Sequence, residues 1–384
     1  MKSIKKISMS ALALSLLATN VPSVVHAEGN TDVPMHVDIQ KWVRKETGVY
    51  GPATSFTFNV APGTAADADE RNNAVKAGIE GGVVFENATI DLTPEVESSL
   101  NNNVIYSKQK AKLKIVNDKF TSPGVYRYVI TETVGDYAGM HYRTDSKYFD
   151  VYVQNGANGM EVYSYTFVNK ENNKVKDSTG GGFVNDYGVA PGPVPVTPDP
   201  TNPNDQPTNE EPTRTTDTNP NKALSKLKIK KEVRGNQGDK QKDFTFKLKV
   251  DGDAGEKYNV KFNNTARAAA KIESKGDEVT ITLKDGEWAE ISGLSKDDKV
   301  TVTENSYAAE GYSTKYKDGE NAEAVEGATV ENKKITSDDT VTFINEKEIT
   351  TPTGLLLEYG PYLLLVTAAA GMLVLSLRRR SEEE

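Results

Sequence analysis

Residues Val37–Val43 read Val-Asp-Ile-Gln-Lys-Trp-Val, and residues Leu227–Val233 read Leu-Lys-Ile-Lys-Lys-Glu-Val. Side chains of a β-strand point alternately to its two faces, so every second residue shares a face. In each stretch one such face is apolar except for a single lysine, Lys41 in the first and Lys231 in the second. Each stretch therefore predicts a half-buried strand that aims one lysine into a hydrophobic interior, where lysine is rare.

A glutamate and an asparagine follow each of these lysines in a similar setting. Glu132 ends an apolar face formed by Tyr126, Tyr128 and Ile130, and Glu304 follows Val300 and Val302 in the same way. An asparagine stands within an apolar run near the end of each half. The two predicted trios, in chain order, are Lys41, Glu132 and Asn185, and Lys231, Glu304 and Asn345.

Burial gives such a trio a chemistry. Loss of water favours the neutral amine of lysine and the neutral acid of glutamate. A neutral amine held against an amide carbon is a nucleophile, while the acid polarises the amide carbonyl and moves protons. The expected product is a Lys–Asn isopeptide bond with loss of ammonia. The alternative is a buried, hydrogen-bonded pair without a bond, and the repetition of the same order in both halves favours the bond.

Both ends of the chain are predicted to be targeting segments. Lys2, Lys5 and Lys6 precede an apolar run and the sequence Val-His-Ala, which predicts a signal peptide at residues 1–27. Residues Leu355–Leu377 are long and apolar enough to cross a bilayer, and Arg378–Arg380 follow. The positive-inside rule then places the C-terminus in the cytoplasm and the rest of the chain outside the cell.

Thr351, Pro352, Thr353 and Gly354 stand directly before this apolar run. Together with the span and the basic tail they resemble a sortase sorting signal, in which the enzyme cuts between Thr and Gly and transfers the threonine acyl group to an amine. Proline keeps the backbone extended and glycine allows close approach. The common Leu-Pro-x-Thr-Gly form is changed here, which leaves open which sortase reads it. A plain membrane anchor is the alternative.

Composition between the two ends predicts an all-β protein. Short runs rich in β-formers alternate with turn pairs such as Asn155-Gly156 and Asp285-Gly286, which favours two antiparallel sandwiches. Residues from about Gly188 to Asn221 are rich in Pro, Thr, Asn and Asp and predict an extended spacer. Around Thr64–Ser99, where Ala and Glu accumulate, we expect an insertion with a short helix. The predicted segments are 1–27, 28–187, 188–221, 222–349 and 350–384, the last being sorting signal, membrane span and tail.

Several kinds of function are disfavoured. The formal net charge of −9 offers no footprint for nucleic acid, and membrane contact is expected only in the precursor. The chain has no cysteine and three scattered histidines, which predicts no metal site. We expect no cofactor and no enzyme acting on a diffusible substrate.

These motifs together resemble the major, or backbone, pilin of Gram-positive pili, of the T-antigen type found in streptococci. Local matches include Phe56–Pro62, Pro123–Glu132 and Lys242–Phe246. The resemblance implies two tandem immunoglobulin-like domains of the Cna B type, with bonds that map to Lys41–Asn185, assisted by Glu132, and to Lys231–Asn345, assisted by Glu304. It also implies a pilus on the cell surface, anchored to the cell wall.

The resemblance further implies polymerisation through a lysine of the next subunit. Lys174, followed by Val175 and ahead of the bonding asparagine, matches that position best, with Lys176 and then Lys170 behind it. The implied partners are sortase, other copies of the chain, minor pilins and peptidoglycan. The alternative function is a wall-anchored adhesin that binds a host matrix protein or a glycan, for which the stretch around Thr64–Ser99 is the one block large enough to suggest a separate ligand-binding region.

Overall fold

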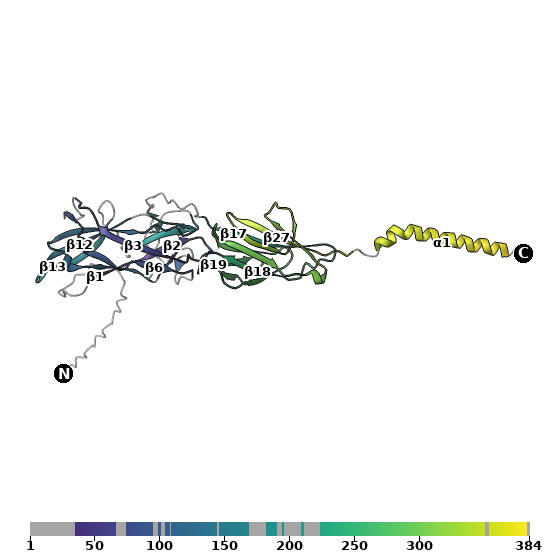
Figure 1. The fold of residues 1–384 in the computed structure, drawn as a ribbon, viewed down its shortest axis with the longest axis horizontal. Coiled ribbons are helices and arrows are strands. Elements are labelled where there is room, and N and C mark those ends of the chain that lie inside the picture. Colours follow the sequence, from purple (N-terminus) through teal and green to yellow (C-terminus); the bar gives the residue numbers. More distant parts are fainter. Residues whose placement is uncertain are drawn as a thin grey trace, which may run out of the picture.

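The computed structural model describes residues 35–66, 74–94, 99–100, 104–107, 109–143, 146–168, 182–189, 194–195, 209–210, 223–349 and 353–381. The regular secondary structure of these residues is β-strand, apart from helix α1 (Thr353–Ser381) and two 3₁₀ helices of three residues each, with turns and irregular segments between the elements. Two β-domains lie end to end, and α1 follows the second (Figure 1). The predicted all-β class is confirmed.

The first domain packs three sheets around one core. One sheet has the order β13-β12-β10-β3-β6, with β4 beside β10; the others are β11-β14-β2-β8-β7 and β1-β9-β5. The strands are β1 (Met35–Ile39), β2 (Lys41–Lys45), β3 (Thr54–Pro62), β4 (Val75–Ala77), β5 (Val83–Asn87), β6 (Thr89–Leu92), β7 (Ser99–Leu100), β8 (Val104–Tyr106), β9 (Ala111–Ile115), β10 (Gly124–Glu132), β11 (Met140–His141), β12 (Lys147–Gly156), β13 (Gly159–Val168) and β14 (Phe183–Tyr187).

The first predicted strand is interrupted at Gln40. β1 pairs with β9, whereas β2 pairs with β14 and β8, so the chain changes sheet at this residue. The Gln40 side chain is buried and its Nε2 donates to the main-chain oxygen of Ser107 (2.5 Å). The prediction of one continuous strand is therefore wrong here, although the alternate residues of the stretch, Lys41 among them, are buried.

The second domain is a sandwich of two sheets, with orders β20-β19-β22-β17-β27-β24-β25 and β21-β18-β23-β26. Its first strand, β17, alternates between buried and more exposed residues along most of its length, because one face packs on the core. The strands are β17 (Ser225–Arg234), β18 (Phe244–Asp251), β19 (Lys257–Phe262), β20 (Ala270–Glu273), β21 (Val279–Leu283), β22 (Trp288–Leu294), β23 (Lys299–Glu304), β24 (Ser313–Asp318), β25 (Val325–Glu326), β26 (Thr329–Lys334) and β27 (Asp339–Glu346).

The stretch around Thr64–Ser99 differs from its prediction. Its described residues form β4, β5, β6 and the start of β7, and none of them is helical. β5 pairs with β9 and β6 pairs with β3, so these strands belong to the sandwich itself. Local composition favoured a helix, but pairing with strands distant in sequence decided the structure. The expected short helix is not found in the described part of this stretch.

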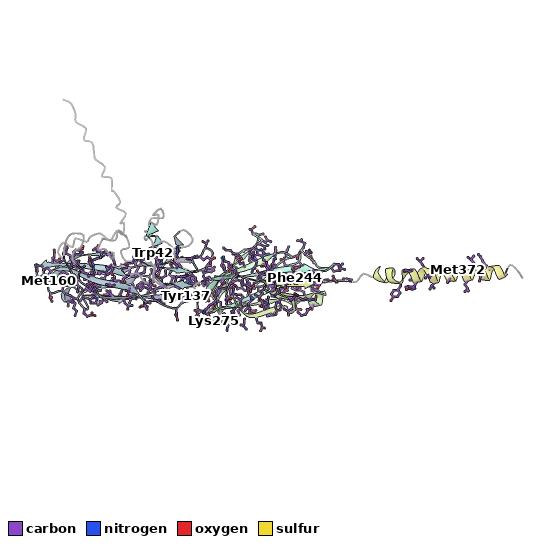
Figure 2. All side chains as sticks on the ribbon, turned by 90° about the horizontal axis from the view of Figure 1, so that it is seen from above. Trp42, Tyr137, Met160, Phe244, Lys275 and Met372 are labelled. Carbon is purple, nitrogen blue, oxygen red and sulfur yellow. The ribbon has the colours of Figure 1, made fainter. Side chains whose placement is uncertain are left out.

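The predicted spacer lies mostly outside the described residues, and its extended form stays a prediction. Within it, β15 (Val194–Pro195) pairs with β16 (Asn209–Glu210). The two domains nevertheless contact each other directly. Asn259 Nδ2 donates to the oxygen of Gly48 (3.0 Å), and Lys226 Nζ lies 2.8 Å from Glu46 Oε1. The hydroxyl of Tyr137, labelled near the junction in Figure 2, donates a hydrogen bond to Glu256 Oε1 across the interface (2.7 Å).

Helix α1 contains an apolar window, Tyr359–Ser376, with a mean hydropathy of 1.6. The side chains described in this window are almost all exposed. At 1.5 Å rise per residue, 18 residues span about 27 Å, close to the thickness of a bilayer's hydrocarbon core. The helix therefore fits the predicted transmembrane segment.

Candidate functional site

The lysine and the asparagine of each trio lie on neighbouring parallel strands in the same register. In the first domain Lys41 of β2 is opposite Phe183 of β14, and Asn185 stands two residues further along. In the second domain Lys231 of β17 is opposite Phe343 of β27, and Asn345 again stands two residues further along. Because residues two apart share a face, lysine and asparagine are diagonal neighbours on the core side in both domains.

The glutamate approaches from the facing sheet. Glu132 of β10 pairs with Phe58 of β3, and Glu304 of β23 pairs with Phe246 of β18. Both partner phenylalanines end a Phe-Thr-Phe run, whose first members are Phe56 and Phe244. In both domains the lysine Nζ lies 4.4 Å from the ring centroid of that first phenylalanine. The two sites are thus built from equivalent positions of the two domains.

All six side chains are withdrawn from water. Lys41 and Asn185 have 0% exposed surface and Glu132 has 7%. In the second domain the residue exposures are 1% for Lys231, 2% for Glu304 and 0% for Asn345. Burial of a lysine and a glutamate carries a large desolvation cost unless they pair or become neutral together. In each site, burial therefore favours transfer of a proton from the lysine to the glutamate, which leaves both groups neutral.

In the first domain the carboxyl group of Glu132 bridges the other two side chains. Lys41 Nζ lies 2.6 Å from Glu132 Oε2, and Asn185 Nδ2 donates to Glu132 Oε1 (2.5 Å). The amide oxygen of Asn185 accepts a hydrogen bond from the main-chain N–H of Arg143 (3.0 Å). Since a main-chain N–H can only donate, this contact fixes which end of the Asn185 amide is oxygen.

In the second domain one carboxyl oxygen serves both partners. Glu304 Oε1 lies 3.2 Å from Lys231 Nζ and accepts from Asn345 Nδ2 (2.9 Å). Lys231 Nζ also donates to the main-chain oxygen of Phe343 (3.4 Å). Glu304 Oε2 and Asn345 Oδ1 are buried and have no hydrogen-bond partner among the described residues. The second site is therefore less fully hydrogen-bonded than the first.

Burial sets the protonation states of the second site. It lowers the pKa of Lys231 to about 8, against the opposing attraction of Glu304. It raises the pKa of Glu304, while Lys231 and the Asn345 amide act in the opposite direction. The two shifts bring the amine and the acid closer in proton affinity, so transfer of one proton from Lys231 to Glu304 yields two neutral groups. The neutral amine beside an amide is the arrangement expected for nucleophilic attack.

Most residues of the predicted sorting signal and all three candidate acceptor lysines contribute no side-chain geometry. Thr353 and Gly354 are the first residues of α1, whereas Thr351 and Pro352 lie outside the described residues. The acceptor candidates Lys170, Lys174 and Lys176 also lie outside them. Sortase recognition and the choice of acceptor lysine therefore stay predictions.

One group at the first site was not predicted from the sequence. The Arg143 N–H that contacts Asn185 belongs to the main chain, which every non-proline residue offers, so no sequence signal marks it. Its side chain binds Asp186, whose carboxylate is fully buried between Arg143 and Arg44. An aspartate inside the apolar run Phe183–Tyr187 is the one local sign that a buried ion pair lies beside Asn185.

Each of the two domains matches a known protein family. Residues 37–188 match the family described as "Spy0128-like isopeptide containing domain", and residues 225–347 match a domain of unknown function, DUF7601. A curated protein named "Pilin", from Streptococcus pyogenes serotype M1, is 27% identical over 332 residues, which cover 83% of each chain. The pilus tip adhesin Cpa of Streptococcus pyogenes is 29% identical over 130 residues, 34% of this chain and 18% of the adhesin.

Among solved structures, the major pilin from Streptococcus pyogenes superposes with a TM-score of 0.54 at 22% identity. The alignment covers 82% of this chain and 99% of that one. At this identity the likeness concerns the fold, and it extends over nearly all of that pilin.

Proposed function

This chain belongs to the streptococcal type of major pilin, and on that premise we propose that it is the shaft subunit of a surface pilus, strengthened by a Lys–Asn isopeptide bond inside each domain. The role is structural and involves no diffusible substrate. The observation that carries the proposal is the duplication of the buried trio, at the same strand register, in two domains that match different families.

The proposed reaction balances without a cofactor. The neutral Nζ of Lys41 or Lys231 attacks the Cγ atom of Asn185 or Asn345, and a new Nζ–Cγ bond forms. The Cγ–Nδ2 bond breaks, and Nδ2 takes up one proton and leaves as ammonia. Glu132 or Glu304, which is protonated when the amine is neutral, supplies that proton and takes up the proton that the amine releases, so the carboxyl group ends in the state in which it began. Each crosslink forms once per molecule.

The crosslinks suit a fibre under tension. Each bond would join a strand near the start of its domain to the domain's last strand, β2 to β14 and β17 to β27. Force would then pass through a covalent bond instead of unzipping main-chain hydrogen bonds. In the loop-entropy description a closure of this length stabilises by about 4–5 kcal/mol. Slow unfolding and resistance to proteases are expected to matter more for a protein exposed on a cell surface.

Assembly completes the proposed function. After export, sortase cuts between Thr353 and Gly354 and joins the Thr353 carbonyl to a lysine of the next subunit, Lys174 in our assignment, with Lys176 and Lys170 as alternatives. Helix α1 would hold the precursor in the membrane until that cleavage. The finished pilus would include minor pilins and be anchored to peptidoglycan. The resemblance of part of the chain to a tip adhesin keeps direct host binding as the second candidate function.

Intact mass spectrometry of the mature polypeptide, residues 28–349, tests the crosslinks. Each bond removes one ammonia, so the parent should weigh about 34 Da less than its sequence, and Glu132→Ala and Glu304→Ala should each restore about 17 Da. Fragment spectra of a digest should identify a crosslinked peptide pair in which Lys41 is bonded to Asn185. A parent at its full sequence mass would reduce both trios to buried polar clusters and leave the pilin assignment without its covalent reinforcement.

A further inference from the structure

We propose that the main-chain N–H of Arg143 is the oxyanion donor for crosslinking in the first domain, and that Asp186 positions it by binding the Arg143 guanidinium. The inference rests on the proposed isopeptide reaction and adds a catalytic group to it. It also implies that the two domains form their bonds at different rates, because no equivalent donor contacts Asn345 among the described residues.

The contact lies where negative charge must develop. When Lys41 attacks Asn185, the amide oxygen Oδ1 becomes the oxyanion of a tetrahedral intermediate. The Arg143 nitrogen is 3.0 Å from that oxygen, within the 2.7–3.1 Å range typical of oxyanion-hole donors. The site is sealed from water, and in such surroundings an already oriented dipole stabilises charge strongly.

With the carbonyl oxygen held by Arg143, Glu132 can serve proton transfer alone. Its Oε2 lies beside the attacking Nζ of Lys41 (2.6 Å), and its Oε1 accepts from the departing Nδ2 of Asn185 (2.5 Å). One carboxyl group therefore spans nucleophile and leaving group. In the intermediate the pair of electrons from the C=O bond resides on Oδ1; it re-forms the carbonyl as ammonia leaves.

The Arg143 main chain is anchored from its side chain. Nε and Nη2 donate to Asp186 Oδ2 (3.1 and 2.9 Å), and Arg44 Nε of β2 donates to Asp186 Oδ1 (2.6 Å). Asp186 follows Asn185 directly on β14 and is fully buried. The strand that carries the reacting amide thus also carries the carboxylate that fixes the donor, which ties their relative position to a buried ion-pair network.

The second domain provides the internal comparison. Asn345 Oδ1 is buried without a hydrogen-bond donor among the described residues, and a single oxygen of Glu304 contacts both Lys231 and Nδ2. Among the described residues, Glu304 is the group left to stabilise the intermediate there. In the unaltered chain we expect the Lys41–Asn185 bond to form faster than the Lys231–Asn345 bond.

The test follows both bonds in the same molecules. The mature chain is produced by pulse-labelled cell-free synthesis, quenched in acid at intervals and digested, and the two crosslinked peptides are quantified by mass spectrometry. Arg143→Pro deletes the N–H and should slow the first-domain bond about 10²–10³-fold relative to the second-domain bond. Arg143→Ala and Asp186→Asn keep the N–H but remove its anchor, so smaller losses are expected, and Arg143→Lys should recover part of the rate.

The matched control is another buried Arg–Asp pair of the same domain. Arg127 Nη2 of β10 lies 2.7 Å from Asp150 Oδ2 of the neighbouring strand β12. Both residues are buried, on the face of that sheet that points away from Glu132. Asp150→Asn removes a comparable ion pair and should leave the ratio of the two crosslinking rates unchanged. The pH profile of the first-domain rate should also keep its shape in Asp186→Asn, because Lys41 and Glu132 still set it, whereas a general opening of the core would shift it.

If Arg143→Pro and Asp186→Asn both show the same ratio of first-domain to second-domain crosslinking rates as the parent, the inference is overturned, while the crosslinking proposal stays intact. If Arg143→Pro does not fold, the test compares Asp186→Asn with Asp150→Asn. Equal effects of these two variants on the ratio of the crosslinking rates would overturn the inference. Absence of both crosslinks from the parent would instead defeat the proposed function, and the inference with it.

Discussion

A buried acidic cluster near the domain junction should make the second domain less stable as the pH rises. Asp298 is 2% exposed, and burial together with the negative charge of Glu256 raises its pKa from 3.8 to about 7. The unfolded chain loses this proton near pH 4, whereas the folded domain keeps it until about pH 7. Between these values the folded state binds more protons, so the free energy of unfolding falls with rising pH.

The magnitude follows from the size of that change. Each pH unit between the two pKa values contributes about 1.4 kcal/mol, so the full effect is about 4 kcal/mol at most. Asp298→Asn removes the titration, and its amide can still accept the hydrogen bond that the Ser295 N–H donates to Asp298 Oδ2 (2.7 Å). The variant should match the parent at pH 4 and exceed its stability above pH 7.

Denaturant unfolding monitored by tryptophan fluorescence measures this difference. The chain has two tryptophans, Trp42 in the first domain and Trp288 in the second, so a Trp42→Phe background leaves a probe of the second domain alone. In that background, unfolding free energies are compared with and without Asp298→Asn from pH 4.5 to pH 8, with crosslinks intact in both proteins. Parallel pH curves for the two proteins would refute the assignment of the buried proton to Asp298.

Three further variants probe the junction, a turn and a crosslink. Gly252→Ala should destabilise the second domain by about 1–3 kcal/mol, because an added Cβ would lie 2.0 Å from the Tyr258 hydroxyl; an unchanged thermal midpoint would contradict this. Tyr137→Phe removes a hydrogen-bond donor from the buried Glu256 carboxylate and should weaken the contact between the domains by about 1.5–3 kcal/mol. The measurement is the rate of protease cleavage between the domains, which should rise, and Tyr163→Phe, at an exposed site, is the control. Asn345→Ala should prevent the second crosslink and lower the thermal midpoint of that domain alone; a midpoint equal to the parent's would show that the crosslink adds no stability.

The trios could be predicted because strand geometry is local. Alternation places Lys231 on the same face as Leu227 and Ile229, and that face is buried along β17. An ionisable residue on such a face stands out without any knowledge of its partners. The same reasoning located Glu304 and Asn345, and the structure brings all three together within hydrogen-bonding reach.

Local patterns failed where a partner strand or a second domain determined the outcome. The break at Gln40 depends on β2 joining a different sheet from β1, and the strands around Thr64–Ser99 depend on pairing with β3 and β9. The raised pKa of Asp298 arises where Glu256 approaches it inside the folded domain, and Tyr137 reaches that same Glu256 carboxylate from the other domain.

The sequence by itself therefore determined the strand class, the inward direction of the lysines and the chemistry that buried amine, acid and amide can perform, because each follows from residue type and a period of two. Only the tertiary structure decided which groups surround that chemistry: the Arg143 N–H on Asn185, the unpartnered oxygen of Asn345 within the described residues, and the buried carboxylates near the junction. Such contacts join segments far apart in the chain. Their geometry is fixed by the packing of whole sheets, and no short stretch of sequence encodes it.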